Sequence, residues 1–227
     1  MKIGILQTGH APEELKEEFG EYSGMFEALL AGNDFEFEAY HVVDNVFPDD
    51  IHSADGWLIT GSKHGAYEDL IWIPPLEDFI RACVTENVPM VGICFGHQII
   101  AQALGGKVEK FDGGWAIGRQ VYDFAGTEIA LNAWHQDQVT ELPPGALAVA
   151  SNDFCENAAI IYGDRAFTVQ AHPEFDGLFV DGLINSRGRG VVPDEILDAA
   201  EETLAEPVAS QTIADQFADF FRQERTQ

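Results

Sequence analysis

Positive charge is scarce in this sequence of 227 residues. Twelve Lys and Arg side chains stand against 39 Asp and Glu side chains, which gives a formal net charge of -27 at pH 7. A surface this negative repels phosphate backbones and anionic lipid headgroups, so nucleic acid is not an expected partner. The simplest interpretation of the acidity is a solvated surface suited to a saline environment.

Cysteine is scarce as well, with only Cys83, Cys94 and Cys155. These three are too few and too scattered for a disulfide framework or a zinc site. No cluster of His, Asp and Glu has metal-ligand spacing along the chain. We therefore expect no metal and no cofactor.

Long apolar runs are missing too. The N-terminus, MKIGILQTGH, turns polar after a few apolar residues and lacks the apolar core of a signal peptide. No other run is long enough to cross a bilayer. We expect a cytoplasmic protein with reduced thiols and no membrane partner.

The first half of the chain alternates short apolar runs with helical patterns. Helices between buried strands favour a parallel sheet that is covered on both faces. The pattern predicts strands at 2–6, 35–43, 56–60 and 89–93, helices at 22–30, 74–87 and 95–104, and a polar loop at 8–20.

The second half changes character twice. Residues 107–171 are rich in Val, Ile, Ala and Thr and are interrupted by Gly and Pro, which indicates further strands and hairpins. From about residue 176 the pattern is helical again and ends in an amphipathic helix at 211–223. No repeat or linker interrupts the chain, so we expect one α/β domain, 1–227, with a helical tail from about 176.

The segment V-P-M-V-G-I-C-F-G-H-Q has the most specific pattern. An apolar strand leads into Gly92, Cys94 and Gly96, and a helix starts at once. Gly-x-nucleophile-x-Gly at such a junction is the nucleophile elbow, in which a Cβ atom on either glycine would collide. The helix N-terminus favours the thiolate, and the amide of Phe95 is placed to bind an oxyanion. The competing interpretation is a buried cysteine in a tight turn.

A thiolate nucleophile needs a general acid, usually a histidine held by a third group. The last apolar run ends in His172, Pro173 and Glu174. If the strand continues through them, His172 and Glu174 project to the same face, and the carboxylate can set the imidazole tautomer. Pro173 restricts His172 to extended conformations. By itself, His-Pro-Glu also fits a turn at a strand end.

Together, G-I-C-F-G-H-Q at 92–98 and H-P-E at 172–174 resemble the class I glutamine amidotransferases, whose triad is Cys-His-Glu. The resemblance covers most of the chain. With H-Q-D at 135–137 and L-P at 142–143, it is strongest for the stand-alone branch of synthase-like amidotransferases and plant-type γ-glutamyl peptidases. It implies a flavodoxin-like three-layer α/β/α fold with a mostly parallel sheet, and amide hydrolysis through a thioester.

The resemblance also implies roles for individual residues. Cys94 matches the nucleophile, His172 the acid and base, and Glu174 the orienting group. The backbone amides of Gly61 and Phe95 match the oxyanion hole. The positions that match contacts to the glutamyl substrate are Gln98, His135, Gln136 and Asp137.

One loop departs from the family pattern. Where members fused to synthetases carry Gly-Gly-Pro-like loops, residues 60–67 read T-G-S-K-H-G-A-Y. Its His64 and Tyr67 would overhang Cys94, as substrate contacts or as plain surface residues. No nucleotide-binding region follows Glu174, and no Gly-rich loop has the helix start that a phosphate site needs.

Several functions stay open at this point. The enzyme would hydrolyse glutamine or another small γ-glutamyl compound, either alone or as a subunit that passes ammonia to a separately encoded acceptor synthase. The missing synthetase region slightly favours the first. A catalytically silent glutamine-binding or regulatory subunit is the alternative, and the filled triad positions argue against it. An α/β-hydrolase is excluded by chain order, since His172 precedes Glu174.

Overall fold

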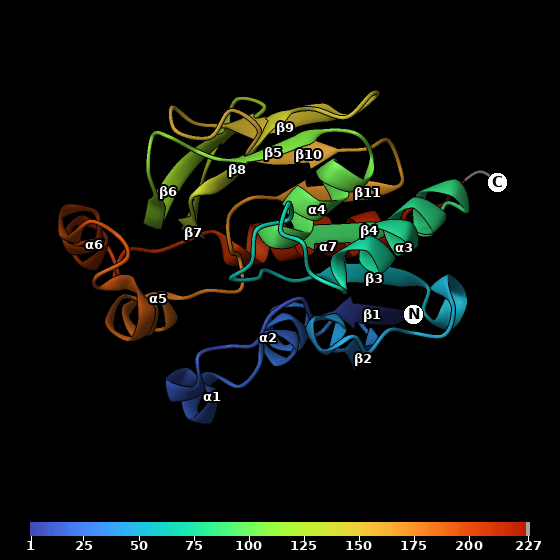
Figure 1. Ribbon diagram of the computed structural model, residues 1–227, viewed down its shortest axis with the longest axis horizontal. Helices are drawn as coiled ribbons and strands as arrows, with labels where there is room; N and C mark the ends of the chain where they lie inside the picture. The colour runs from blue at the N-terminus through green and yellow to red at the C-terminus, as the bar shows by residue number, and fades with distance from the viewer. Residues whose placement is uncertain (226–227) are drawn as a thin grey trace.

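Figure 1 shows the computed structural model, which describes residues 1–225. Its central sheet contains five parallel strands: β1 (Lys2–Leu6), β2 (Glu36–Tyr40), β3 (Gly56–Ile59), β4 (Met90–Ile93) and β11 (Ala166–Val169). They lie in the spatial order β2-β1-β3-β4-β11. Strands β3, β4 and β11 are buried at every position, as expected of apolar runs covered on both faces.

The sheet continues past β11 through four antiparallel strands, which makes nine strands within residues 1–225. In spatial order these are β10 (Ala159–Ile161), β9 (Leu147–Ser151), β6 (Ala116–Phe124) and β7 (Thr127–His135). Ala125 and Gly126 join β6 to β7 with positive φ at both positions, as a twisted two-residue hairpin turn requires. Strands β5 (Lys107–Lys110) and β8 (Asp137–Glu141) pair separately. The predicted strands and hairpins of 107–171 are confirmed.

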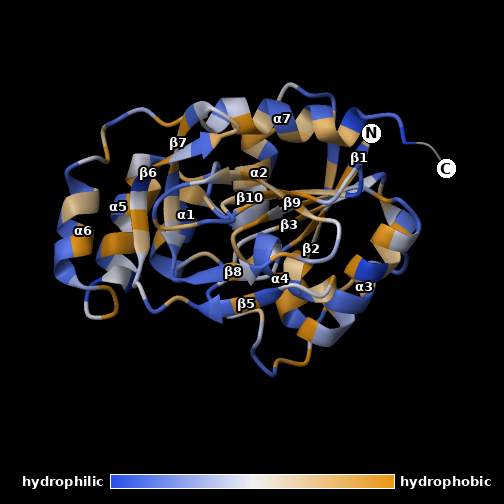
Figure 2. Ribbon diagram, turned by 90° about the horizontal axis from the view of Figure 1, so that it is seen from above, coloured by the Kyte–Doolittle hydropathy of each residue, from blue (hydrophilic) through white to orange (hydrophobic). Residues whose placement is uncertain are grey.

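Helices cover both faces of the sheet. One face is covered by α2 (Tyr22–Leu29) and α7 (Ser210–Arg222). The other face is covered by α3 (Ile73–Thr85) and α4 (Phe95–Ala103). Phe26 of α2 and Phe217 of α7 belong to one apolar cluster with Ile5 and Ile93. Leu76 of α3 lies in a second cluster, which also contains Ile99 of α4 and Met90. Figure 2 shows α7 on one side of the strands and α3 and α4 on the other. The predicted α/β class is therefore correct.

The remaining helices gather at one end of the molecule, beside β6 and β7 (Figure 1). They are α1 (Glu13–Phe19), α5 (Gly177–Leu183), a π-helical turn (Ile184–Gly188) and α6 (Asp194–Glu201). Leu15, Phe179 and Leu197 share a third apolar cluster there. The prediction of a plain loop at 8–20 is wrong, because α1 lies within it. Leu15 is the only buried residue of this short helix, so no apolar period marks it.

Two short 3-10 turns, Val42–Asp44 and Ile51–Ser53, complete the described secondary structure. Among residues 1–225, no helix is both long enough and apolar enough to pass through a bilayer.

Candidate active site

Cys94 lies in the turn between β4 and α4, as predicted. Its φ of 50° and ψ of -102° are a strained conformation for a residue with a Cβ atom. The turn is held on both sides, since Cys94 N donates to Val169 O at 2.9 Å and Gly96 N donates to Thr60 O at 3.2 Å. The chain is thereby clamped between β11 and the end of β3.

The two glycines of this turn are required by space. A Cβ atom on Gly92 would lie 2.6 Å from Gly96 O, and one on Gly96 would lie 2.2 Å from Ile59 O. Both distances are far below contact distance. The collision predicted from the sequence is confirmed, and Cys94 is the residue that this turn presents at the carboxyl end of the sheet.

His172 is buried and held from two directions. Its Nδ1 lies 2.7 Å from Glu174 Oε1, with the His172 and Glu174 side chains only 6% and 1% exposed. Its ring stacks on Phe175, with ring centres 4.1 Å apart and planes 4° apart. The contact with Glu174 places the Nδ1 proton on the carboxylate side, so Nε2 is the nitrogen left for chemistry.

The backbone of this pair differs from the extended strand expected from the sequence. Strand β11 ends at Val169, and His172 forms only an isolated antiparallel bridge with Asn132. Phe175 N donates to His172 O at 3.3 Å, which closes a turn over Pro173 and Glu174. The prediction of an extended strand through Glu174 is therefore wrong, and the alternative of a turn at the strand end is correct. The reason is that His172 is the last residue here to pair with a neighbouring strand within residues 1–225.

Electrostatics favour the protonated form of His172. Burial lowers its pKa, but the Glu174 carboxylate and the nearby sulfur of Cys94 outweigh burial and raise the pKa above its usual value. Glu174 Oε2 is buried with no hydrogen-bonding partner within residues 1–225. Within the same residues, the imidazole of His172 is therefore the one hydrogen-bonding partner of this carboxylate.

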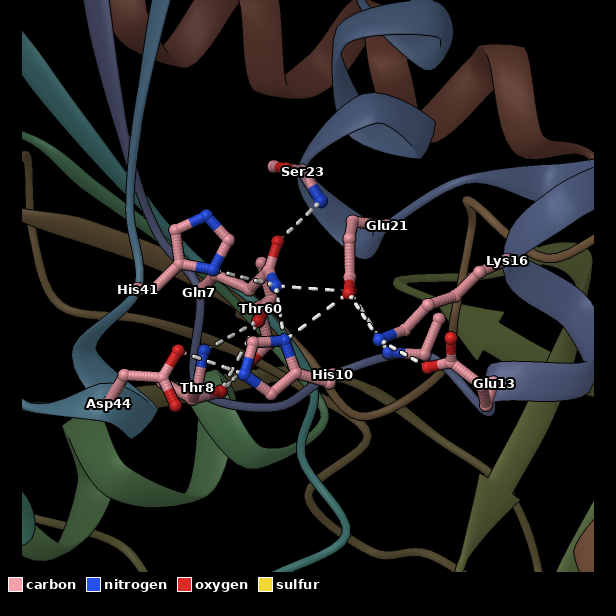
Figure 3. Close-up of polar contacts among 11 residues, drawn as sticks. Gln7, Thr8, His10, Glu13, Lys16, Glu21, Ser23, His41, Asp44 and Thr60 are labelled. Atoms are coloured by element: carbon pink, nitrogen blue, oxygen red, sulfur yellow. Dashed lines mark hydrogen bonds and ion pairs between the residues drawn. The ribbon is translucent and has the colours of Figure 1, made fainter.

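Gly61 brings its backbone against both side chains. A Cβ atom at this position would lie 2.8 Å from His172 Cε1 and 3.7 Å from Cys94 Cβ. Within residues 1–225, neither the Gly61 amide nor the Phe95 amide donates a hydrogen bond to another residue. The Thr8 hydroxyl lies 2.9 Å from Thr60 O (Figure 3) and 3.0 Å from Gly61 O, and these contacts anchor the start of the loop.

A cavity of about 320 Å³ opens over this point. It collects the residues matched from the sequence, with the exception of Phe95, whose side chain is buried elsewhere in the core. The matched residues that line it are Gly61, Cys94, Gln98, His135, Gln136, Asp137, His172 and Glu174. His64 and Tyr67 of the departing loop line it too.

The segment 135–137 is fixed by contacts of its own. Gln98 Nε2 donates to Asp137 O at 2.9 Å and to Gln170 Oε1 at 3.1 Å, so its donors hold the protein rather than a ligand. Burial, together with the charge of His172, lowers the pKa of His135 to about 3 and keeps that ring neutral. Its Nε2 is buried without a partner in the described chain. Gln136 Nε2 donates to Phe111 O at 3.3 Å.

Side chains that could hold a metal ion lie outside this cavity. Donor atoms of His10, His41 and Asp44 all come within 4.8 Å of one another (Figure 3). No metal-ligand spacing was evident in the sequence, because His10 follows β1 whereas His41 and Asp44 follow β2. His10 Nε2 already lies 3.0 Å from Asp44 Oδ2, and His10 Nδ1 lies 3.2 Å from Glu21 Oε1. Hydrogen bonds therefore account for the cluster without an ion.

Several lining residues carried no signal in the sequence. They come from segments far apart along the chain and include Tyr22, Lys110, Trp134 and Arg187. None belongs to a motif, so only packing brings them to the cavity.

Comparison with known proteins gives consistent findings. The family model "Glutamine amidotransferase class-I" matches residues 36–178. Gamma-glutamyl peptidase 3 of Arabidopsis thaliana is 30% identical over 213 residues, which cover 85% of this chain and 84% of that protein. A GMP synthase (glutamine-hydrolyzing) of Azoarcus sp. strain BH72 is 32% identical over 199 residues, 73% of this chain but 37% of that protein.

A solved structure shares the fold. The crystal structure of a glutamine amido transferase from Methylobacillus flagellatus superposes with a TM-score of 0.77 at 23% identity, over 97% of this chain and 91% of the other.

Proposed function

Because this chain belongs to the class I glutamine amidotransferase family, we propose that it hydrolyses a γ-glutamyl amide bond with Cys94 as nucleophile. His172 serves as acid and base, and Glu174 orients it. One observation carries the proposal: the cysteine on the strained turn, the glutamate-bound imidazole and the Gly61 backbone meet at the floor of one cavity.

The proposed reaction has two halves. The Cys94 thiolate attacks the γ-carbonyl carbon, and the amides of Gly61 and Phe95 stabilise the resulting oxyanion. His172 gives its proton to the departing nitrogen, the C–N bond breaks, and a glutamyl thioester remains on Cys94. His172 then removes a proton from water, which attacks the thioester; glutamate leaves and the thiolate returns. The raised pKa of His172 supports its role as the proton donor of the first half.

The fate of the leaving amine distinguishes two versions. The likeness to a γ-glutamyl peptidase over most of both chains supports a hydrolase that acts alone on γ-glutamyl compounds. The alternative is a glutaminase that hands ammonia to a separately encoded synthase, which the likeness to part of a GMP synthase favours. A silent glutamine-binding subunit is disfavoured, because such a protein has no need of a strained Cys94 beside a paired imidazole.

We also propose the finer description of the architecture. The order β2-β1-β3-β4-β11 follows the pattern of flavodoxin-like sheets, in which ligands bind at the carboxyl ends of the strands. Thr8, Gly61 and Cys94 lie at that edge. Residues 1–227 would then form one domain.

The test is glutamate release by the purified chain alone, from γ-glutamyl dipeptides and from glutamine. We expect turnover of at least one substrate, and a loss of at least roughly a thousandfold in Cys94→Ser. Wild-type activity in Cys94→Ser would overturn the nucleophile. No turnover by the isolated chain, restored by a copurifying synthase, would favour the ammonia-donating version.

A further inference from the structure

The basic side chains of this acidic protein fall into two groups. Of the twelve Lys and Arg side chains, nine form an ion pair or a hydrogen bond with another residue of 1–225. These nine are Lys2, Lys16, Arg81, Lys107, Arg119, Arg165, Arg189, Arg222 and Arg225. The other three, Lys63, Lys110 and Arg187, have no such partner in the described chain, and all three line the cavity above Cys94.

The three unpartnered cations reach the cavity from separate elements. Lys63 lies in the loop after β3, Lys110 ends β5, and Arg187 lies in the π-helical turn after α5. Isolated π turns occur frequently at functional sites. Arg187 also lies beyond residues 36–178, the part that matches the family model, so the family core does not supply it.

Carboxylates are close by but are already engaged. Glu68 accepts from the Gly65 amide at 2.8 Å and lies 3.2 Å from His64 Nδ1. Burial and the Asp137 carboxylate raise the pKa of Tyr67 to about 12, so that hydroxyl stays protonated beside Asp137. Glu174 is bound to His172. The acids of the cavity thus contact other protein groups. The three cations form no ion pair or hydrogen bond within residues 1–225, although the charge of Lys110 acts on the Asp137 carboxylate.

The net charge sharpens the contrast. A molecule with 39 acidic side chains repels an anionic substrate, whereas a cavity with unpartnered cations attracts one locally. Free glutamine carries one carboxylate and one ammonium and has no net charge. A γ-glutamyl peptide carries a further carboxylate on the leaving-amine side and is a net anion.

From this pattern we infer that Lys63, Lys110 and Arg187 recognise a carboxylate on the leaving-amine part of the substrate. The substrate class is then an anionic γ-glutamyl peptide rather than glutamine. This inference rests on the proposed hydrolysis of γ-glutamyl amides at Cys94.

A matched pair of substrates tests it. γ-Glutamylglycine and γ-glutamylglycinamide share the glutamyl group and the scissile bond and differ in a terminal carboxylate. At low salt we expect kcat/KM to favour the acid by about tenfold, which corresponds to about 1.4 kcal/mol shared among three exposed ion pairs. Added salt should reduce that preference.

Charge-removing variants identify the residues. Lys63→Gln, Lys110→Gln and Arg187→Gln should each lower kcat/KM for the acid by roughly two- to fivefold and leave the amide substrate unaffected. Lys107→Gln is the matched control: Lys107 lies on the same strand as Lys110 but pairs with Glu109 outside the cavity. It removes the same charge and should leave the preference unchanged.

The outcomes separate the two proposals. Equal cleavage of both substrates by the wild type overturns the inference and leaves the hydrolase intact. Equal slowing of both substrates by the three variants also overturns it, because the cations would then bind the glutamyl α-carboxylate. No cleavage of either substrate or of glutamine overturns the proposed function itself. A preference for the acid that disappears in the triple variant, but not in Lys107→Gln, is the supporting result.

Discussion

The protonation of His172 depends on the Glu174 carboxylate and the Cys94 sulfur. Burial lowers the pKa of this imidazole, and Glu174 and the Cys94 sulfur raise it by more, so the folded-state pKa lies above that of a free histidine. With a raised pKa, the proton is present throughout the neutral range and is lost only as pH rises through the higher value. The activity should therefore have an alkaline limb that reports on His172.

Glu174→Gln keeps the shape of the side chain and removes its charge. We expect the alkaline limb of kcat/KM to move to lower pH by roughly one to three units, because one of the two groups that raise the pKa of His172 is gone. The peak rate should fall less than in His172→Ala, since the proposed role of Glu174 is to orient the imidazole and that of His172 is to transfer the proton. Profiles of kcat/KM against pH for the three proteins decide this, and an alkaline limb that stays in place would exclude His172 as the titrating group.

The three cysteines should differ in reactivity. Burial raises the pKa of the Cys83 and Cys155 thiols to about 12, and both side chains are almost fully buried. Iodoacetamide should therefore modify Cys94 at least roughly tenfold faster than either, as followed by peptide mass spectrometry. In Cys94→Ala the fast phase should vanish. Equal labelling of all three would contradict the assignment of Cys94 as the reactive thiol.

At the scale of elements, the turn between β4 and α4 contributes to the stability of the fold and also positions Cys94. The same backbone path that presents Cys94 needs close approach of neighbouring chain, and glycine is the residue that permits it. The amide of Gly96 bonds to Thr60 O, next to the Gly61 loop, so the turn and the loop are held to each other.

Gly96→Ala tests this coupling. Its added Cβ would lie 2.2 Å from Ile59 O, which is backbone and has little room to move. We expect the free energy of unfolding in urea to fall by about 2 kcal/mol or more. Gly24→Ala in α2 is the control, because a Cβ there meets no atom within 4 Å. It should stabilise the protein by about 0.5–1 kcal/mol, and equal effects of the two changes would contradict the tight-turn argument.

At the scale of the whole molecule, the net charge of -27 opposes folding through self-repulsion. Twelve cations cannot neutralise 39 carboxylates, so screening by salt should stabilise the fold. We expect Tm to rise by several degrees between about 0.05 and 0.5 M NaCl. Calorimetry in NaCl and Na₂SO₄ at equal ionic strength makes the comparison. A rise confined to sulfate would indicate exclusion of that salt from the surface instead of charge screening.

Local pattern was sufficient for much of this protein. The strand-to-helix turn at Cys94, the parallel strands of the first half and the strands of 107–171 were predicted correctly, because periodicity and glycine placement act over a few neighbouring residues. The family was predicted correctly from the resemblance of the motifs at 92–98 and 172–174. Helix α1 was not predicted, because a single buried leucine gives no apolar periodicity. An extended strand was predicted at His172 in place of the turn, because the residue that pairs with His172, Asn132, lies 40 residues away in the sequence.

Only the tertiary structure shows which residues from remote segments meet at the cavity. The sheet order sets Gly61 against His172, and the π-helical turn brings Arg187 to a cavity whose other cations come from β5 and the loop after β3. No local pattern encodes such meetings, since each results from packing between segments that are remote along the chain. The sequence by itself identified the candidate residues for the proposed chemistry and determined where the backbone must turn. Which charges surround that chemistry, and hence which substrates it accepts, depends on how the elements pack.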